Sequence, residues 1–314
     1  MGKIAFLFPG QGSQTVGMGK EIADKYEEAA AIFQKADERL GFSLSEVIFN
    51  GPQEKLTRTE NTQPALLTTS TAILEVFKKH GITADFTAGH SLGEYSALVA
   101  SESMSFEDAV YAVRKRGELM EEAVPAGVGT MAAVLGMEAA ELKAVVDEVS
   151  TPQFVVNLAN LNCPGQIVIS GNREAVEKAS ELAKEKGAKR VIPLDVSGPF
   201  HSDLMKPAAD KFSEVLEGIS ISEAKIPVVA NVTAQPITDG ADIQAKLVEQ
   251  LYSPVRWEET VQTLLDEGVD TFIEIGPGKV LSGLVRKVKR RVHTYNIENE
   301  ETLAKTVEKL KGDA

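Results

Sequence analysis

Short apolar runs alternate with longer amphipathic segments along most of the chain. Residues 3–8 form an apolar run that ends at a proline–glycine pair, which is typical of a strand followed by a tight turn. Residues 62–81 have helical character, with a proline near the start and a glycine after the end. Further strand-like and helix-like segments follow at 85–89, 92–100, 270–276, 279–288, 291–297 and 301–310. This alternation predicts an α/β fold with a largely parallel sheet.

The middle of the chain has a different order of elements. Strand, helix, strand, strand, helix and strand are expected at 130–135, 138–149, 153–159, 166–170, 173–187 and 189–195. This order is that of the ferredoxin-like motif, and its two central strands would be joined by a turn-rich link at 160–165. The sequence therefore predicts a ferredoxin-like subdomain at 126–197, inserted into an α/β core formed by 1–125 and 198–314.

The segment Gly89-His90-Ser91-Leu92-Gly93 lies between a predicted strand and a predicted helix. In the G-x-S-x-G turn the chain reverses so sharply that a side chain at either glycine would clash, and the serine hydroxyl is exposed above the sheet. The amides of the following helix N-terminus can stabilise an oxyanion there. The pattern predicts Ser91 as a nucleophile, and the alternative is a tight packing turn with an incidental serine.

A serine nucleophile needs a general base, and the chain has four histidines. His80 ends a predicted helix beside two lysines, and His90 is adjacent to Ser91, where the two side chains should diverge. His293 lies in a late strand, where a hydrolase with the order serine, acid, histidine would have its base. His201 lies in a Gly-Pro loop just before a helix. Spacing alone leaves His201 and His293 as candidates.

One arginine falls on the apolar face of a predicted helix. At 100° per residue, Ala109, Ala112, Val113 and Met120 cluster on one face, and Arg116 lies in its middle. A guanidinium that points inward needs an anionic partner, because burying it unpaired is too costly. That partner could be an internal carboxylate, the side chain could instead extend out to solvent, or Arg116 could hold a substrate carboxylate by a bidentate contact.

Composition and charge narrow the class of protein. The chain has 314 residues, 43% of them hydrophobic and 25% charged, which suits a large folded core. A single cysteine, Cys163, rules out an intrachain disulfide and suits a reducing cytoplasm. The opening apolar run is too short for a signal peptide or a membrane span. A net charge of −13 argues against nucleic acid as a partner.

Two other motifs have alternative interpretations. The basic run Arg286–Arg291 is either a solvated helix end or a docking patch for an acidic partner. The glycine-rich loop after the first strand fails both phosphate-binding patterns, because Thr15 replaces the last glycine and Met18 stands where a lysine is needed. This loop could instead supply the second amide of an oxyanion hole.

The motifs FPGQGSQ, GHSLGEYSAL, RGxLM, NCPGQIVISG, GPFH and EIGPGKVLSGL occur together between residues 8 and 284. In combination they resemble the malonyl-CoA:acyl carrier protein transacylases of bacterial fatty acid synthesis. The resemblance implies an α/β-hydrolase-like core with an inserted ferredoxin-like subdomain, in agreement with the order of elements. It also implies a cytoplasmic enzyme without a metal or bound cofactor.

The resemblance assigns roles to individual residues. Ser91 matches the nucleophile, and His201 matches the general base, which decides against His293. Arg116 matches the residue that binds the malonyl carboxylate. Three further sets are implied, namely the oxyanion-hole amides of Gln11 and Leu92, the main-chain carbonyl of Gln250 that holds the histidine, and the cleft positions Gln63, Asn160 and Asn162. Phe200, just before the histidine, is the type associated with malonyl rather than methylmalonyl transfer.

The resemblance implies malonyl-CoA as substrate, acyl carrier protein as acceptor, and a monomer. The carrier protein is acidic in this family, so basic residues are candidates for docking it: Lys189, Arg190, Arg286, Lys287, Lys289, Arg290 and Arg291. Three alternatives are a freestanding acyltransferase of a polyketide synthase, a serine esterase or thioesterase, and a catalytically inactive binding module. The intact catalytic positions argue against the last of these.

Overall fold

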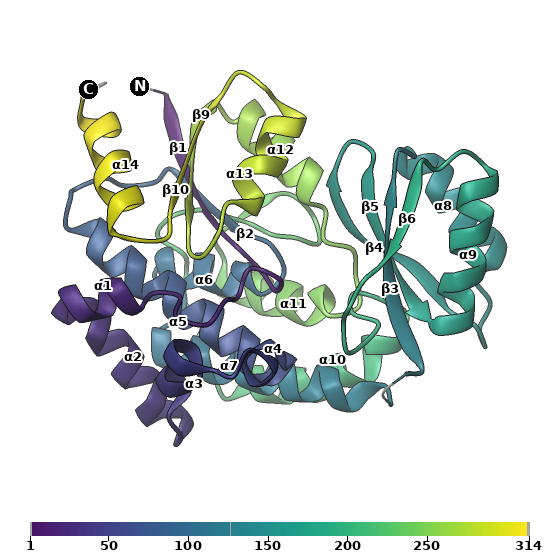
Figure 1. The fold of residues 1–314 in the computed structure, drawn as a ribbon, viewed down its shortest axis with the longest axis horizontal. Coiled ribbons are helices and arrows are strands. Elements are labelled where there is room, and N and C mark those ends of the chain that lie inside the picture. The colour runs from purple at the N-terminus through teal and green to yellow at the C-terminus, as the bar shows by residue number, and fades with distance from the viewer. Residues whose placement is uncertain (1, 126, 313–314) are drawn as a thin grey trace.

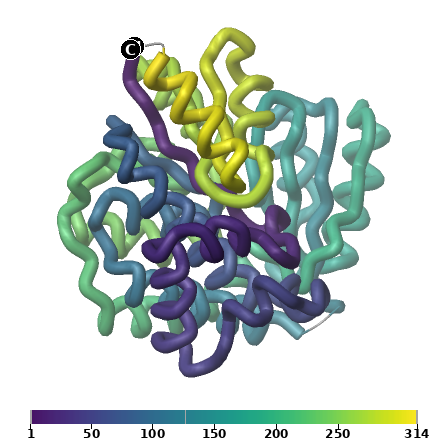
Figure 2. Tube along the Cα trace, turned by 60° about the vertical axis from the view of Figure 1, so that its left-hand side comes forward, coloured from purple at the N-terminus to yellow at the C-terminus, as the bar shows by residue number. Residues whose placement is uncertain are grey.

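A computed structural model describes residues 2–125 and 127–312, which form two separate sheets with their helices (Figures 1 and 2). The larger sheet has the strand order β10-β9-β1-β2-β7-β8, and the smaller has the order β4-β5-β3-β6. In both views the smaller sheet stands beside the larger α/β body and does not continue its sheet. The strands are β1 Lys3–Phe8, β2 Phe86–Gly89, β3 Gly129–Leu135, β4 Val156–Cys163, β5 Gln166–Asn172, β6 Arg190–Pro193, β7 Val228–Val229, β8 Pro236–Ile237, β9 Val269–Ile275 and β10 His293–Ile297.

The topology confirms the predicted fold class. In the larger sheet β10, β9, β1, β2 and β7 all pair in parallel, and only β8 is antiparallel. In the smaller sheet every pair is antiparallel, and its first and third strands, β3 and β5, are central. This is the ferredoxin-like arrangement. The division into 1–125 with 198–314 and 126–197 remains a prediction, and its boundary residue Ala126 lies outside the described residues.

Helices cover both faces of the larger sheet and one face of the smaller (Figure 1). On β1, Phe6 and Phe8 face a core that includes the buried helix α5, whereas Ala5 and Leu7 face a second core with Trp257. This alternation is the period of two that a strand between two helical layers requires. The helices are α1 Lys20–Lys25, α2 Glu27–Leu40, α3 Leu44–Asn50, α4 Gln53–Thr57, α5 Thr59–Lys78, α6 Gly93–Ala100, α7 Phe106–Ala123, α8 Ala139–Val149, α9 Arg173–Glu185, η1 Asp203–Met205, α10 Lys206–Glu217, α11 Gly240–Gln250, α12 Trp257–Asp266, α13 Val280–Val288 and α14 Glu300–Gly312. Within the described residues, none of these helices has the length and apolar character needed to cross a bilayer.

The turn-rich link predicted at 160–165 is wrong for residues 160–163, which belong to a strand. Strand β4 continues to Cys163, so that only Pro164 and Gly165 make the turn to β5. Two register shifts in the β4–β5 pair leave Ala159 and Asn162 without partners on β5 while the strand continues past them. On its other side β4 is held by Val255, whose N–H donates to Ala159 O at 2.8 Å and whose carbonyl accepts from Leu161 N–H at 2.9 Å. The sequence shows neither the bulges nor this partner.

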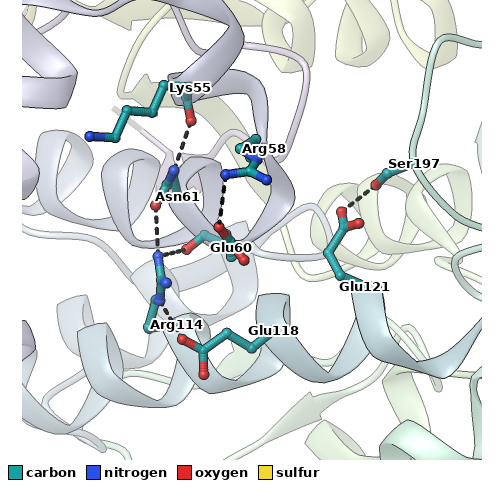
Figure 3. Close-up of polar contacts among 8 residues, drawn as sticks. All are labelled: Lys55, Arg58, Glu60, Asn61, Arg114, Glu118, Glu121 and Ser197. Atoms are coloured by element: carbon teal, nitrogen blue, oxygen red, sulfur yellow. Dashed lines mark hydrogen bonds and ion pairs between the residues drawn. The ribbon is translucent and has the colours of Figure 1, made fainter. Parts of the chain in front are cut away.

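Helix α5 begins at Thr59, three residues before the predicted start at residue 62. The side chain of Arg114 on α7 makes this earlier start possible (Figure 3). Pro64 has no N–H, so the carbonyl of Glu60 lacks its intrahelical donor. Arg114 Nη1 donates to this carbonyl at 3.0 Å and to Asn61 Oδ1 at 2.6 Å, while its Nε donates to Glu118 at 2.6 Å. The guanidinium thereby replaces the missing helical bond and joins the first turn of α5 to α7.

We predict that Arg114→Ala lowers the free energy of unfolding by about 2 kcal/mol, because it leaves the Glu60 carbonyl without a donor in a partly buried place. The matched control is Arg58→Ala, whose ion pair with Glu60 is 3.7 Å long and whose side chain is 70% exposed. This control should change the free energy by less than about 0.5 kcal/mol. Urea titrations of both variants measure the difference, and equal losses would contradict the role assigned to Arg114.

Candidate active site

The turn between β2 and α6 exposes Ser91 because three backbone segments approach too closely for side chains. A Cβ added at Gly89 would lie 1.9 Å from the carbonyl of Gly93, and one added at Gly93 would lie 2.1 Å from Phe8 O. Ser91 itself has φ of 51°, in the left-handed region that L residues rarely adopt. The predicted reason for both glycines is therefore confirmed, and the strained serine lies at the carboxyl end of the parallel strands.

An asparagine that sequence reasoning missed braces this turn. Asn231 is fully buried just after the two-residue strand β7. Its Oδ1 accepts from Ser91 N–H at 2.7 Å, and its Nδ2 donates to Gly89 O at 2.7 Å. These bonds satisfy backbone groups on both sides of the bend and hold Ser91 in its strained conformation. No motif in the sequence indicates Asn231, because its partners are about 140 positions away.

The structure brings Ser91 and His201 together. Ser91 Oγ lies 2.8 Å from His201 Nε2, and His201 Nδ1 lies 2.8 Å from the main-chain oxygen of Gln250. That oxygen can only accept, so the neutral ring carries its proton on Nδ1 and Nε2 accepts from the serine. Burial, with the nearby charge of Arg116, lowers the pKa of His201 to about 3. The imidazole is therefore available as a base at neutral pH.

The other candidate histidine is not near the serine. His293 is exposed at the beginning of β10, which lies at the edge of the sheet, whereas Ser91 follows the end of β2. His90 points away from Ser91, as expected for adjacent residues on a sharp turn. Its Nε2 lies 2.8 Å from Asn162 Oδ1, and its ring packs against Trp257 with centroids 5.5 Å apart.

Arg116 is 1% exposed and its guanidinium reaches the nucleophile. Nη2 donates to Ser91 Oγ at 3.1 Å and to Gln250 Oε1 at 3.0 Å, and Nη1 donates to Gln63 Oε1 at 2.8 Å. All of these acceptors are neutral, and Arg116 forms no ion pair with any residue that the structure describes. Its Nε also lacks an acceptor there. The internal salt bridge considered from the sequence is thus absent from the described part, and donors remain for a further anion.

A cavity of about 130 Å³ adjoins Ser91, Arg116 and His201. The remaining residues that line it are Gln11, His90, Leu92, Met120, Met131, Asn160, Leu194, Val196 and Phe200. The backbone N–H groups of Gln11 and Leu92 have no hydrogen-bond acceptor within residues 2–125 and 127–312. Two free amides beside a serine hydroxyl are the donors that an oxyanion requires.

The remaining predicted cleft residues take three different places. Asn160 lines the cavity directly. Asn162 contacts His90 instead of the cavity, and Gln63 lies behind Arg116, where its Nε2 also donates to Met120 Sδ at 3.4 Å. Among the described residues, no group of three or more His, Cys, Asp or Glu side chains could hold a metal ion.

Comparison with known proteins places the chain in a family. The model of the acyl transferase domain matches residues 5–312. The chain belongs to the acyl transferase domain family. This acyl transferase is 63% identical over 311 residues to the malonyl CoA-acyl carrier protein transacylase of Bacillus subtilis (strain 168), covering 99% of this chain and 98% of that protein.

Solved structures agree with this assignment. A malonyl CoA-acyl carrier protein transacylase from Clostridium perfringens ATCC 13124 is 44% identical to this acyl transferase, with a TM-score of 0.95 over 99% of this chain and 98% of that one. A malonyl-transacylase in complex with a type II PKS acyl-carrier protein is 42% identical, with a TM-score of 0.95 over 98% and 99%.

We predict that His201 of this acyl transferase stays neutral between about pH 5 and pH 8, because burial and Arg116 hold its pKa below that window. Ring ¹⁵N NMR spectra, assigned with a His201→Gln variant, should show the tautomer protonated on Nδ1 across this range. Arg116→Ala should raise the pKa of His201, since it removes the nearby positive charge. A wild-type His201 that titrates near its ordinary value would contradict the assignment.

Proposed function

We propose that this acyl transferase moves a malonyl group from malonyl-CoA to the phosphopantetheine thiol of acyl carrier protein, through a malonyl-serine intermediate. The observation that carries the proposal is the position of Ser91 Oγ, which is within hydrogen-bond distance of both a neutral base and a buried cation. The 63% identity to a protein named for this activity supports the choice of substrate and acceptor.

In the first half-reaction, Ser91 Oγ attacks the thioester carbonyl while His201 Nε2 takes the hydroxyl proton. The amides of Gln11 and Leu92 stabilise the oxyanion of the tetrahedral intermediate. The carbon–sulfur bond then breaks, and His201 returns its proton to the leaving thiolate of coenzyme A. Because thiols have pKa values near 8.5, this leaving group needs little help from an acid.

Arg116 selects among acyl groups by binding the free terminal carboxylate that a malonyl group carries. Its Nη2 donates to Ser91 Oγ, and a malonyl carboxylate that took the place of this hydroxyl would also accept from the remaining N–H of Nη1, which is a bidentate contact. An acetyl group carries no such charge and leaves the buried guanidinium without an anion. Arg116 alone can therefore discriminate a malonyl from an acetyl group by about several kcal/mol.

In the second half-reaction, the roles at the serine are reversed. His201 takes the proton of the incoming phosphopantetheine thiol, and the thiolate attacks the malonyl carbonyl. The ester bond to Ser91 breaks, and His201 returns the proton to Oγ. Since the malonyl group is held on Ser91 between the two steps, the exchange is ping-pong, and coenzyme A leaves before the carrier protein reacts.

The predicted docking patch consists of two basic segments that lie near each other. Lys287 Nζ donates to Gln166 Oε1 at 2.9 Å, at the β4–β5 turn. Gly165 of that turn accepts from Gly136 N–H at 2.8 Å, and Gly136 packs against the side chain of Lys189. The β4–β5 turn thus contacts both basic segments. It lies at the end of β4, the strand that carries Asn160 and Asn162.

These cations have no carboxylate partners in the described part of the chain. The patch comprises Lys189, Arg190, Arg286, Lys287, Lys289, Arg290 and Arg291, all of them exposed. Unpaired positive charge on a chain of net charge −13 is complementary to an acidic carrier protein. The related complex with a type II PKS carrier keeps a polyketide carrier as a second candidate acceptor. The monomeric state and the cytoplasmic location remain predictions.

The selectivity of loading tests the proposed reaction. Mixing the protein with malonyl-CoA should add a malonyl mass to the peptide that contains Ser91, and Ser91→Ala should abolish it. Arg116→Ala should lower the malonyl loading rate by at least roughly 100-fold and the acetyl rate by far less, because only malonyl uses the cation. Loss of both rates in equal measure would contradict selection by Arg116, and no adduct at all would contradict the function.

Charge reversal tests the docking patch. Lys287→Glu with Arg290→Glu should raise KM for fatty-acid carrier protein roughly tenfold and leave loading from malonyl-CoA unchanged. The control, Lys309→Glu with Lys311→Glu on α14, changes the net charge equally at exposed positions outside the patch. An unaltered KM in the patch variant would eliminate this surface. Rates with fatty-acid and polyketide carriers, compared in the wild type, identify the acceptor.

A further inference from the structure

A buried carboxylate lies next to the nucleophile turn, and the reaction as proposed does not use it. Glu94 follows Gly93 on the first turn of α6 and is 1% exposed. Burial raises its pKa to about 7, although hydrogen bonds and the charge of Arg116 act in the opposite direction. Burying a carboxylate has a large desolvation cost, so the hydrogen bonds of Glu94 must offset that cost.

Glu94 connects to Ser91 and Arg116 through one side-chain amide, that of Gln250. Its Oε2 accepts from Gln250 Nε2 at 2.7 Å and from Asn231 N–H at 3.1 Å. The same Gln250 Nε2 donates to Ser91 O at 3.0 Å. At the other end of the amide, Gln250 Oε1 accepts from Arg116 Nη2 at 3.0 Å. The amide therefore lies between a buried carboxyl group and a buried cation.

The chemistry of these partners fixes which way the amide points. The main-chain carbonyl of Ser91 can only accept, so it holds the NH₂ end of Gln250, and Glu94 Oε2 accepts from the same end. The oxygen end is then left for the guanidinium, which can only donate. With the amide reversed, two donors would face each other at Arg116 and two acceptors would face each other at Glu94.

We propose that Glu94 is a positioning residue for acyl selection, which acts through the side-chain amide of Gln250 to hold the Arg116 guanidinium at Ser91 Oγ. This inference rests on the proposed malonyl transfer. It adds that the substrate preference depends on a residue that touches neither the cavity nor the substrate.

The intervening amide explains why this carboxylate does not compete with the substrate. A carboxylate in direct contact with Arg116 would occupy the donors that a malonyl carboxylate needs. With Gln250 between them, the ionised form of Glu94 still favours the buried cation, while the guanidinium keeps a neutral partner, Ser91 Oγ, that a charged ligand can displace without breaking the contact with Gln250. The geometry thus reconciles a stable buried arginine with an open anion site.

The test compares Glu94→Gln, Arg116→Ala and the double variant in loading from malonyl-CoA and acetyl-CoA. Removing the charge weakens a charge-assisted bond, so KM for malonyl-CoA should rise roughly tenfold in Glu94→Gln while kcat falls less than about threefold. Loading from acetyl-CoA should change little. In the Arg116→Ala background, Glu94→Gln should have no further effect on malonyl loading, since its action passes through Arg116.

The matched control is Glu274→Gln, which also removes a buried carboxylate. Glu274 is fully buried and accepts from the N–H groups of Leu281 and Ser282 at the start of α13. This variant should lower the melting temperature without changing the malonyl-to-acetyl ratio. If Glu94→Gln lowers both loading rates equally, or if its effect adds fully to that of Arg116→Ala, the inference is overturned. A wild type that takes no malonyl group would instead refute the proposed function.

Discussion

The site depends on one steric constraint, the close approach of Gly89, Gly93 and the end of β1. Only hydrogen atoms fit between these backbones, because a Cβ at either glycine would lie about 2 Å from a carbonyl oxygen. This contact forces the chain into a bend at which Ser91 has positive φ and its hydroxyl leaves the sheet. Asn231 and Gln250 stabilise the bend by bonding its N–H and its carbonyl. The reactive position is therefore set by backbone packing before any catalytic side chain is considered.

Burial of the side chains determines the protonation of the catalytic base and the strength of the anion site. It lowers the pKa of His201, so the base is neutral, and it raises the pKa of Glu94. It also leaves Arg116 among neutral oxygens, where an arriving carboxylate would interact far more strongly than in water. The dry interior thus accounts for the state of the base and for the proposed preference for a charged acyl group.

The part of this site that could be predicted from the sequence is the local part. The glycines around Ser91 follow from the geometry of a five-residue turn, and the inward direction of Arg116 follows from helical periodicity. The choice of His201 over His293 needed family resemblance, because it depends on which strand ends meet in space. Asn231 and Glu94 were missed, since their roles come from bonds across about 140 to 160 positions. The extent of β4 was missed because its second partner, Val255, lies far along the chain.

Among the described residues, no carboxylate contacts His201 or Arg116 directly. His201 is held by a main-chain carbonyl and Arg116 by two side-chain amides, with the only nearby carboxylate, among the residues described, one amide away at Glu94. A carboxylate against His201 would make it a stronger base but would also repel a malonyl anion a few ångströms away. Because thiolates leave readily, a thioester exchange can accept the weaker base in return for an unopposed anion site. The neutral oxygens around both groups are thus the arrangement that a negatively charged acyl thioester would require.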